Sequence, residues 1–471
     1  MTAPEGKPTA AEGRPRPARR GPADLDLSFA DEATVRSTAG AAAEPDWLLA
    51  DRLEGLRLYQ ALPMESNQLY TGYVDLRNAQ LAEARPLAKG AAPVRKPAAD
   101  ASLLPEGASA YVELDGQGVK SLVVGEEARA AGVVLETLAG LRARDPKLAR
   151  SLLEGGCMLP ENDKLAALTR AFWSAGLFVH VPDGATLAAP IVLRWVAGEA
   201  GSAVLSRTIV SLGEGARASI VEEQVCIECD SPGEAQALFA GTTEIALAAG
   251  SALSFAGLQD FDQRHIAFQH RSARVGEGAT LRWALAQLGG RIVRSRIDNR
   301  LEGDRSTVEQ AEIIFGSSDQ LFDLTSYTHH LGRDTTGNLL SKGALGDRSR
   351  AYLKGLITID RSAIGTDSYL GEFGLLLSRQ ARSVAIPSLE IDQPDCRRAQ
   401  HASSVGPMDE TAVFYLASRG LDLEEAHKLI VMGYLEPVVA RVSLPSIQER
   451  LRDLLAAKWD KRSAAVDAAD A

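Results

Sequence analysis

The spacing of apolar residues divides the chain into a helical front part, a long middle part with strand-like spacing and a helical end. Apolar residues recur every three or four positions in 44–61, in 126–153 and in 163–175, which predicts helices there. Pro146 interrupts the second stretch and predicts two helices instead of one. Gly176 follows the third and is the residue type that commonly ends a helix.

Between about residues 177 and 391 the spacing changes to short apolar runs that are rich in Val, Ile and Thr, such as 177–182 and 191–195. Glycine-containing turns separate these runs, and a loose turn–strand unit recurs around Gly215, Gly250, Gly278, Gly303 and Gly346. A stretch this long without helical spacing favours a sandwich, a barrel or a coiled β-solenoid. The residues alone leave the solenoid and the sandwich equally open.

Helical spacing returns after this region. Asp409 can cap one helix, Asp422 and Glu425 can form a capping pair for the next, and Pro445 can begin the last. We therefore predict five parts: a disordered tail (1–43), a helical N-terminal region (44–176) with a linker at 77–106, a β core (177–391), a C-terminal helical domain (392–461) and a frayed tail (462–471).

Composition narrows the class of protein. The net charge of −11 predicts a body that repels nucleic acid, and no apolar run is long enough to predict a membrane span. Four cysteines in 471 residues do not make a disulfide framework, so a reducing, cytoplasmic setting fits better. An aromatic content of 5% with 42 glycines mildly favours stacked turns of small side chains.

Several residues could carry chemistry. Cys226 and Cys229 form a C-x-x-C pair, but the surrounding residues predict a strand, in which residues three apart face opposite sides. We expect two small, partly buried cysteines there, because no histidine is near in sequence. His329 and His330 should diverge in the same way. No Walker A, H-E-x-x-H or G-x-S-x-G pattern occurs, so neither ATP hydrolysis nor these catalytic classes is predicted.

Cys396 and His401 lie close together where the predicted strands give way to helices. Thiolate and imidazole both suit iron and zinc, and five residues can span two ligands if the segment bends. The pair is therefore a weak candidate for a metal site.

The C-terminal half carries a family resemblance. His401-Ala-Ser-Ser-Val-Gly406 followed by Phe414-Tyr-Leu-Ala-Ser-Arg-Gly420 resembles the SufB/SufD family of iron–sulfur cluster assembly scaffolds, and similarity extends over most of residues 44–440. The chain is closer to SufD, because Ala402 stands where SufB proteins have glutamate. This resemblance implies a right-handed parallel β-helix between two helical regions.

The resemblance also implies a function. The chain would be a non-catalytic subunit of a soluble SufBCD complex, paired with a SufB-like paralogue and docked on the ABC-type ATPase SufC. The C-terminal helices would dock the ATPase, through the candidate residues Ala426, Leu429, Ile430 and Tyr434. The nascent cluster would form near the SufB pairing, and no cofactor would be held stably by this chain alone.

Residue by residue, the family's histidine corresponds to His401. Many SufD proteins have a cysteine where this chain has Ala399, so Cys396 is not the aligned ligand and His401 is the supported candidate. A role for His401 in interface packing stays open. The alternatives are a SufB-like scaffold that carries the cluster, a β-helix enzyme acting on carbohydrate, and a structural solenoid that assembles with itself.

Overall fold

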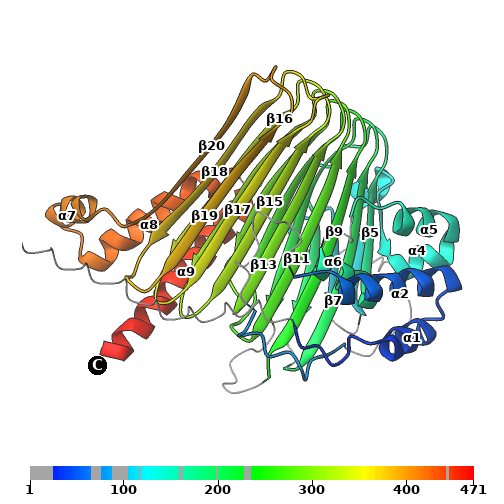
Figure 1. Ribbon diagram of the computed structural model, residues 1–471, viewed down its shortest axis with the longest axis horizontal. Coiled ribbons are helices and arrows are strands. Elements are labelled where there is room, and N and C mark those ends of the chain that lie inside the picture. Colours follow the sequence, from blue (N-terminus) through cyan, green and yellow to red (C-terminus); the bar gives the residue numbers. More distant parts are fainter. Residues whose placement is uncertain are drawn as a thin grey trace, which may run out of the picture.

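The chain folds around a parallel β-solenoid of about eight turns, with helices at both ends of the sequence (Figure 1). The computed structural model describes residues 25–64, 76–86, 104–115, 118–158, 163–197, 200–226, 235–441 and 445–470, with side chains up to residue 461. The predicted solenoid is confirmed, and the sandwich alternative is excluded because successive strands from Ala175 to Pro407 alternate between two sheets and pair in parallel within each sheet.

Each turn of the solenoid gives one strand to sheet A and one to sheet B. Sheet A consists of β1 (Arg85–Pro86), β4 (Val134–Thr137), β5 (Ala175–Val181), β7 (Ser202–Leu212), β9 (Ala237–Leu247), β11 (His265–Val275), β13 (Ile292–Leu301), β15 (Leu321–His330), β17 (Arg350–Ile359) and β19 (Arg382–Ile391). Sheet B consists of β2 (Ala110–Asp115), β3 (Gly118–Val124), β6 (Ile191–Ala197), β8 (Arg217–Cys226), β10 (Ala252–Asp260), β12 (Thr280–Gln287), β14 (Thr307–Gly316), β16 (Thr336–Leu345), β18 (Asp367–Leu376) and β20 (Arg398–Pro407).

The space between the sheets is filled by alternate residues of each strand, because side chains of a strand face opposite sides in turn. Most of this core is aliphatic, with a few large rings such as Trp195, Phe239 and Trp283. Polar residues also face inward. The guanidinium of Arg271 on β11 lies 2.6 Å from the carboxylate of Glu222 on β8, and both side chains are almost fully buried, so an ion pair joins the two sheets inside the solenoid.

A ladder of left-handed backbone positions holds one row of turns together. These residues have positive φ, and each donates its backbone N–H to a carbonyl of the next turn; they are Gly184, Gly215, Gly250, Gly278, Arg305, Asp334 and Gly365. The glycines at 215, 250 and 278 are those of the repeat found in the sequence. Gly303 is not the equivalent residue, because Arg305 takes the left-handed position in its turn.

Replacing Gly250 by alanine should destabilise the solenoid. Gly250 has a φ of +66°, and an L side chain in this region costs about 1–2 kcal/mol. We expect the free energy of unfolding to fall by about that amount in chemical denaturation. Gly40→Ala is the matched control, since Gly40 lies in a helix with nothing within 4 Å of an added Cβ. That control should be neutral or stabilising, and equal losses in both variants would contradict the role of the ladder.

N-terminal helices cover the outer face of sheet A (Figure 1). The helices of this region are α1 (Glu32–Ala41), α2 (Asp46–Ala61), α3 (Glu126–Ala130), α4 (Leu138–Arg144), α5 (Pro146–Glu154) and α6 (Lys164–Phe172). The prediction of a disordered tail through residue 43 was wrong for residues 25–43, because Leu25, Leu27, Phe29 and Val35 are buried against α2, α6 and sheet A. Residues 1–24 of that tail lie outside the described part.

Other N-terminal predictions need correction in detail. The stretch 126–153 contains the short strand β4 in addition to helices, and Gly176 lies inside β5 instead of ending a helix, since α6 already ends at Phe172. Part of the expected linker is ordered, because β1 pairs with β7. Residues 87–103 of that linker are outside the described residues.

C-terminal helices lie on the outer face of sheet B. They are α7 (Glu410–Ser418), α8 (Leu423–Val439) and α9 (Pro445–Asp470), and the predicted caps at Asp409 and Asp422 are confirmed. The boundary at residue 391 was wrong, because the chain makes one more strand, β20, before α7. The helix α9 also continues through the segment that we expected to fray. None of the described helices combines the length and the apolar character that a membrane crossing requires.

Candidate functional site

The C-terminal end of the solenoid carries two strand edges. Among the described strands, β19 pairs only with β17, and β20 pairs only with β18. Each strand therefore presents one row of backbone N–H and C=O groups that no described strand covers. Such edges are templates for pairing with another chain. We call β19 and β20 together the open end.

Apolar side chains are exposed at this open end. Ile391 at the end of β19 is 46% exposed and Val405 on β20 is 39% exposed. Both are unusual in a solenoid whose other strands bury nearly all of their large aliphatic residues. The open end thus combines free strand edges with exposed apolar surface, which is typical of an interface.

His401 lies on β20, in register with Leu370 of β18. Leu370 is 1% exposed and packs with Leu339 and Ile357 between the two sheets. Since paired residues of parallel strands project to the same side, His401 continues this inward column by one turn. Its side chain is exposed, because the solenoid has no further described turn there. The imidazole therefore faces the mouth of the solenoid interior, where a partner's ligands could join it.

Cys396 lies in the turn before β20 and is half-buried. Its thiol donates to the backbone carbonyl of Gln393 at 3.0 Å and packs at the edge of the Leu339–Leu370 cluster. Nothing among the described residues joins it to His401, and neither belongs to a close group of metal-ligand atoms in that part of the chain. The two candidates of the sequence are thus near in the chain but separate in their contacts.

A protonatable carboxyl group lies directly behind the open end. Glu372 on β18 is 1% exposed and is in register with Ser403 of β20. Burial raises the pKa of Glu372 to about 8, and the N–H of Ile386 and the Lys354 ammonium lower it only in part. Its Oε2 accepts the Ile386 N–H at 3.0 Å. The strand next to the open end therefore carries a buried acid that stays protonated at neutral pH.

The adjacent histidines at 329 and 330 diverge, as predicted. His330 faces the interior and contacts the hydroxyls of Thr335 at 2.7 Å and Ser368 at 3.0 Å. Burial lowers its pKa to about 4, so it is neutral. His329 is on the other side of β15 and is only half-buried. Their contacts indicate a structural role.

Among the described residues, the other exposed large apolar side chains lie on the helices α7 and α8. These side chains are 53–74% exposed, and they are Phe414, Tyr415, Leu423 and Leu429, which we call the docking face. Among the described residues of α7 none is buried, although about two thirds of that helix is apolar. Apolar residues displayed in this way on helices are typical of a protein interface.

The docking face differs from the four residues expected from sequence. Leu429 is exposed as expected, and Ile430 is half-buried. Ala426 is fully buried in the contact between α8 and sheet B, so it is not accessible on this chain. The Tyr434 side chain is partly buried against sheet B, where the Lys342 Nζ lies 4.6 Å from its ring centroid. The inward side of α8 holds the helix on the solenoid.

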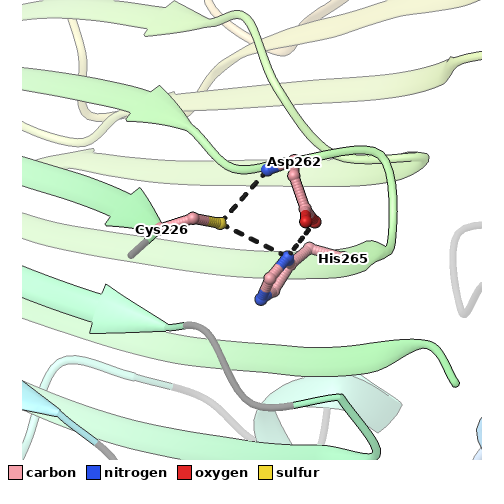
Figure 2. Close-up of side chains that lie close together, drawn as sticks. All are labelled: Cys226, Asp262 and His265. Carbon is pink, nitrogen blue, oxygen red and sulfur yellow. Dashed lines mark hydrogen bonds and ion pairs between the residues drawn. The ribbon is translucent and has the colours of Figure 1, made fainter. Parts of the chain in front are cut away.

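Sequence reasoning missed one group of side chains. Cys226 ends β8, and the turn between β10 and β11 brings Asp262 and His265 next to it (Figure 2). The separation of 39 residues between the cysteine and the histidine hides this group from motif reading. Only the strand register, with Val225 opposite Asp260, reveals it. Cys229 lies outside the described residues.

Comparison with known protein sequences identifies the family of this chain. Residues 195–434 match the family model "SUF system FeS cluster assembly, SufBD core domain". The iron-sulfur cluster assembly protein SufD of Bacillus subtilis is 24% identical over 437 residues, which cover 91% of this chain and 98% of that protein. A SufBD family protein of Mycobacterium leprae is 27% identical over a match that covers 61% of this chain and 73% of that protein. One of Mycobacterium tuberculosis is also 27% identical, over 68% of this chain and 78% of that protein. The chain therefore belongs to the SufBD family of the SUF iron–sulfur cluster assembly system.

Proposed function

We propose that this protein is a SufD-type, non-catalytic scaffold subunit of a cytoplasmic SufBCD complex. The open end carries this proposal, because two strand edges that no described strand covers, with exposed Ile391 and Val405, are suited to pairing with the strands of a partner. A SufB-like paralogue has the family's solenoid and can supply them. The similarity to a protein named SufD over nearly its whole length, with Ala402 after the histidine, favours the SufD role over the SufB-like one.

The ATP-driven part of the reaction would come from a SufC-type ATPase. The sequence has no Walker A motif, so this chain needs a separate ATPase if the complex uses ATP. The docking face on α7 and α8 offers the apolar surface for it. Because α8 and α9 pack directly on sheet B, a movement of the docked ATPase would be transmitted to the solenoid and its open end.

A nascent cluster would assemble at the SufB interface, with His401 as this chain's contribution. The imidazole is exposed at the mouth of the solenoid, and a neutral imidazole is a suitable iron ligand. One ligand does not hold a cluster, so the remaining ligands would come from the paralogue. This chain alone would then hold no cluster stably, and Cys396 would stay a weak second candidate.

Coexpression with SufB-type and SufC-type partners tests the proposed assembly. We expect one complex that contains all three proteins. Ile391→Lys combined with Val405→Lys should remove the SufB-type partner and keep the ATPase, because lysine on an edge strand opposes pairing. Thr307→Lys, on the outer face of sheet B, is the control and should retain both. Retention of the SufB-type partner by the double variant would exclude pairing through the open end.

His401→Ala tests the cluster role separately. We expect the variant to assemble the same complex and to lose iron and acid-labile sulfide per complex, because an exposed histidine contributes little to folding. His427→Ala, on α8, is the control and should keep both at the level of the unchanged protein. If His401→Ala keeps its cluster content, His401 serves in packing at the interface.

A further inference from the structure

Cys226, Asp262 and His265 form a compact group at one row of turns of the solenoid (Figure 2). Cys226 is the last residue of β8, and His265 is the first residue of β11. Asp262 lies in the turn between β10 and β11. The parallel pairing of β8 with β10 places the end of one strand beside the turn that follows the other. Backbone architecture therefore fixes the three side chains next to one another.

The donor atoms of the three residues converge. His265 Nδ1 lies 2.6 Å from Asp262 Oδ1 and 3.5 Å from Cys226 Sγ, and the three donor atoms all lie within 4.8 Å of one another. The backbone N–H of Asp262 donates to Cys226 Sγ at 3.2 Å. Sulfur, imidazole nitrogen and carboxylate oxygen are the usual ligand atoms for zinc and for iron.

The imidazole is held with Nδ1 toward this group. His265 is 1% exposed, and its ring stacks on Phe261 with centroids 5.0 Å apart. Its buried Nε2 has no hydrogen-bond partner among the described residues, so the polar contacts of the ring lie on the Nδ1 side. A buried imidazole fixed in this way is pre-organised as a ligand, since little side-chain freedom remains to be lost on binding.

The Asp262 carboxylate has the charge that a cation site needs. Burial alone would raise the pKa of Asp262, but hydrogen bonds from His265 and Arg264 hold it well below its usual range, so the group is ionised. Arg264 Nε donates to the second oxygen, Oδ2, at 2.7 Å. The backbone N–H of Arg264 donates to Oδ1 at 3.0 Å, so both contacts fix the carboxylate with Oδ1 beside His265 Nδ1. This is the arrangement of an outer residue that orients a ligating carboxylate.

Metal–ligand distances of about 2.0–2.3 Å place tetrahedral ligand atoms roughly 3.3–3.7 Å apart. The distance from His265 Nδ1 to Cys226 Sγ already lies in this range. The distance from His265 Nδ1 to Asp262 Oδ1 would increase by about 0.7 Å when a metal ion displaces the proton between these two atoms. We propose that Cys226, Asp262 and His265 bind one divalent transition metal ion of the Zn²⁺ or Fe²⁺ type. Cys226 and Asp262 are partly exposed, so solvent can supply the remaining ligand.

This site is distinct from the open end. Strands β12, β14, β16 and β18 lie between β10 and β20 in sheet B, so a metal at Cys226 is not the ion that His401 would ligate. The proposal therefore does not depend on the proposed pairing with SufB or on cluster assembly.

Cobalt binding to the full-length, metal-free chain under reducing, oxygen-free conditions tests the site. With Co²⁺ as the probe, we expect one ion per chain and a sulfur-to-cobalt charge-transfer band, and Zn²⁺ should displace the cobalt and abolish the band. Cys226→Ser should remove the band and weaken cobalt binding by about tenfold or more, since even outer residues of metal sites contribute this much. Asp262→Asn should also weaken binding while it keeps the shape of the turn.

Two controls separate this site from other cysteines and from the open end. Cys157→Ser should keep the band, because burial raises the pKa of the Cys157 thiol to about 12 and its sulfur faces backbone carbonyls. His401→Ala should keep it as well. A wild-type chain that is folded by circular dichroism but gives no thiolate band would overturn the proposal. A band that survives Cys226→Ser would overturn it too.

Discussion

Leu423→Asp combined with Leu429→Asp is expected to remove the SufC-type ATPase from the purified complex while the chain itself stays folded. Both residues are more than half exposed on α8, at 60% and 53%. A charge at such a position costs the isolated chain little, because surface substitutions usually change stability by less than about 0.5 kcal/mol. In an interface the same charge would be buried against apolar atoms.

The expected loss of affinity for the ATPase follows from the contribution that residues at the centre of an interface make to binding. A central apolar residue contributes on the order of 2 kcal/mol to binding, which is about thirtyfold in affinity, and burial of an unpaired carboxylate adds to this loss. Two substitutions on one helix should therefore weaken ATPase binding by more than about a hundredfold. Coexpression followed by affinity purification would show this as absence of the ATPase, and titration calorimetry would measure it.

Ala457→Asp is the matched control, because it adds the same charge at an exposed position on α9. It should leave the ATPase bound. Phe414→Asp, on α7, should act like the α8 variant if both helices form one docking face. ATPase binding that persists in the double α8 variant, with an unchanged thermal unfolding curve, would exclude this face as the docking site.

Much of the architecture could be predicted from sequence because strands and caps leave local signals. The short Val- and Ile-rich runs, the turn glycines and the caps at Asp409 and Asp422 all depend on neighbouring residues. The regularity of the turn ladder was partly hidden, because Arg305 and Asp334 occupy left-handed positions that usually select glycine. The repeat therefore looks less regular in sequence than it is in space.

The missed features depend on distant contacts. The strand β20 has little apolar alternation, because its residues are exposed at the open end, and it was therefore assigned to the helical domain. Residues 25–43 have few large apolar side chains, because most of their apolar residues are alanines. Packing of those few against α2 and α6 orders the segment. Ala426 could not be recognised as buried, because the helical pattern shows an apolar side but not whether that side meets sheet B or a partner.

The metal-ligand group was missed for the same reason, and Glu372 is another example. The sequence around Glu372 does not indicate that the glutamate faces the interior, because large apolar residues occur at both even and odd positions near it, such as Leu370 and Phe373. The register of β18 between β16 and β20 decides its direction. Its burial then gives it a pKa that no local motif would suggest.

Glu372→Gln is expected to make the stability of the isolated chain less dependent on pH. The folded-state pKa of Glu372 is about 8, against an ordinary value of 4.5. Between these values the folded protein keeps one proton that the unfolded chain releases. The wild-type chain therefore has the full contribution of the protonated Glu372 below about pH 4.5 and loses it progressively as the pH rises to about 8. Glutamine resembles the protonated acid in shape and does not titrate.

The stability difference between Glu372→Gln and the wild type should thus grow with pH in favour of the variant. One pKa unit corresponds to about 1.4 kcal/mol, so a shift from 4.5 to about 8 amounts to on the order of 4–5 kcal/mol near pH 8.5 and under about 1 kcal/mol near pH 5. Urea unfolding of both proteins across this range would measure it, with the exposed Glu309→Gln as a control that should show no such trend. A constant difference at all pH values would mean that Glu372 is ionised in the folded protein at neutral pH, so that β18 would carry a buried carboxylate behind the open end in place of a neutral acid.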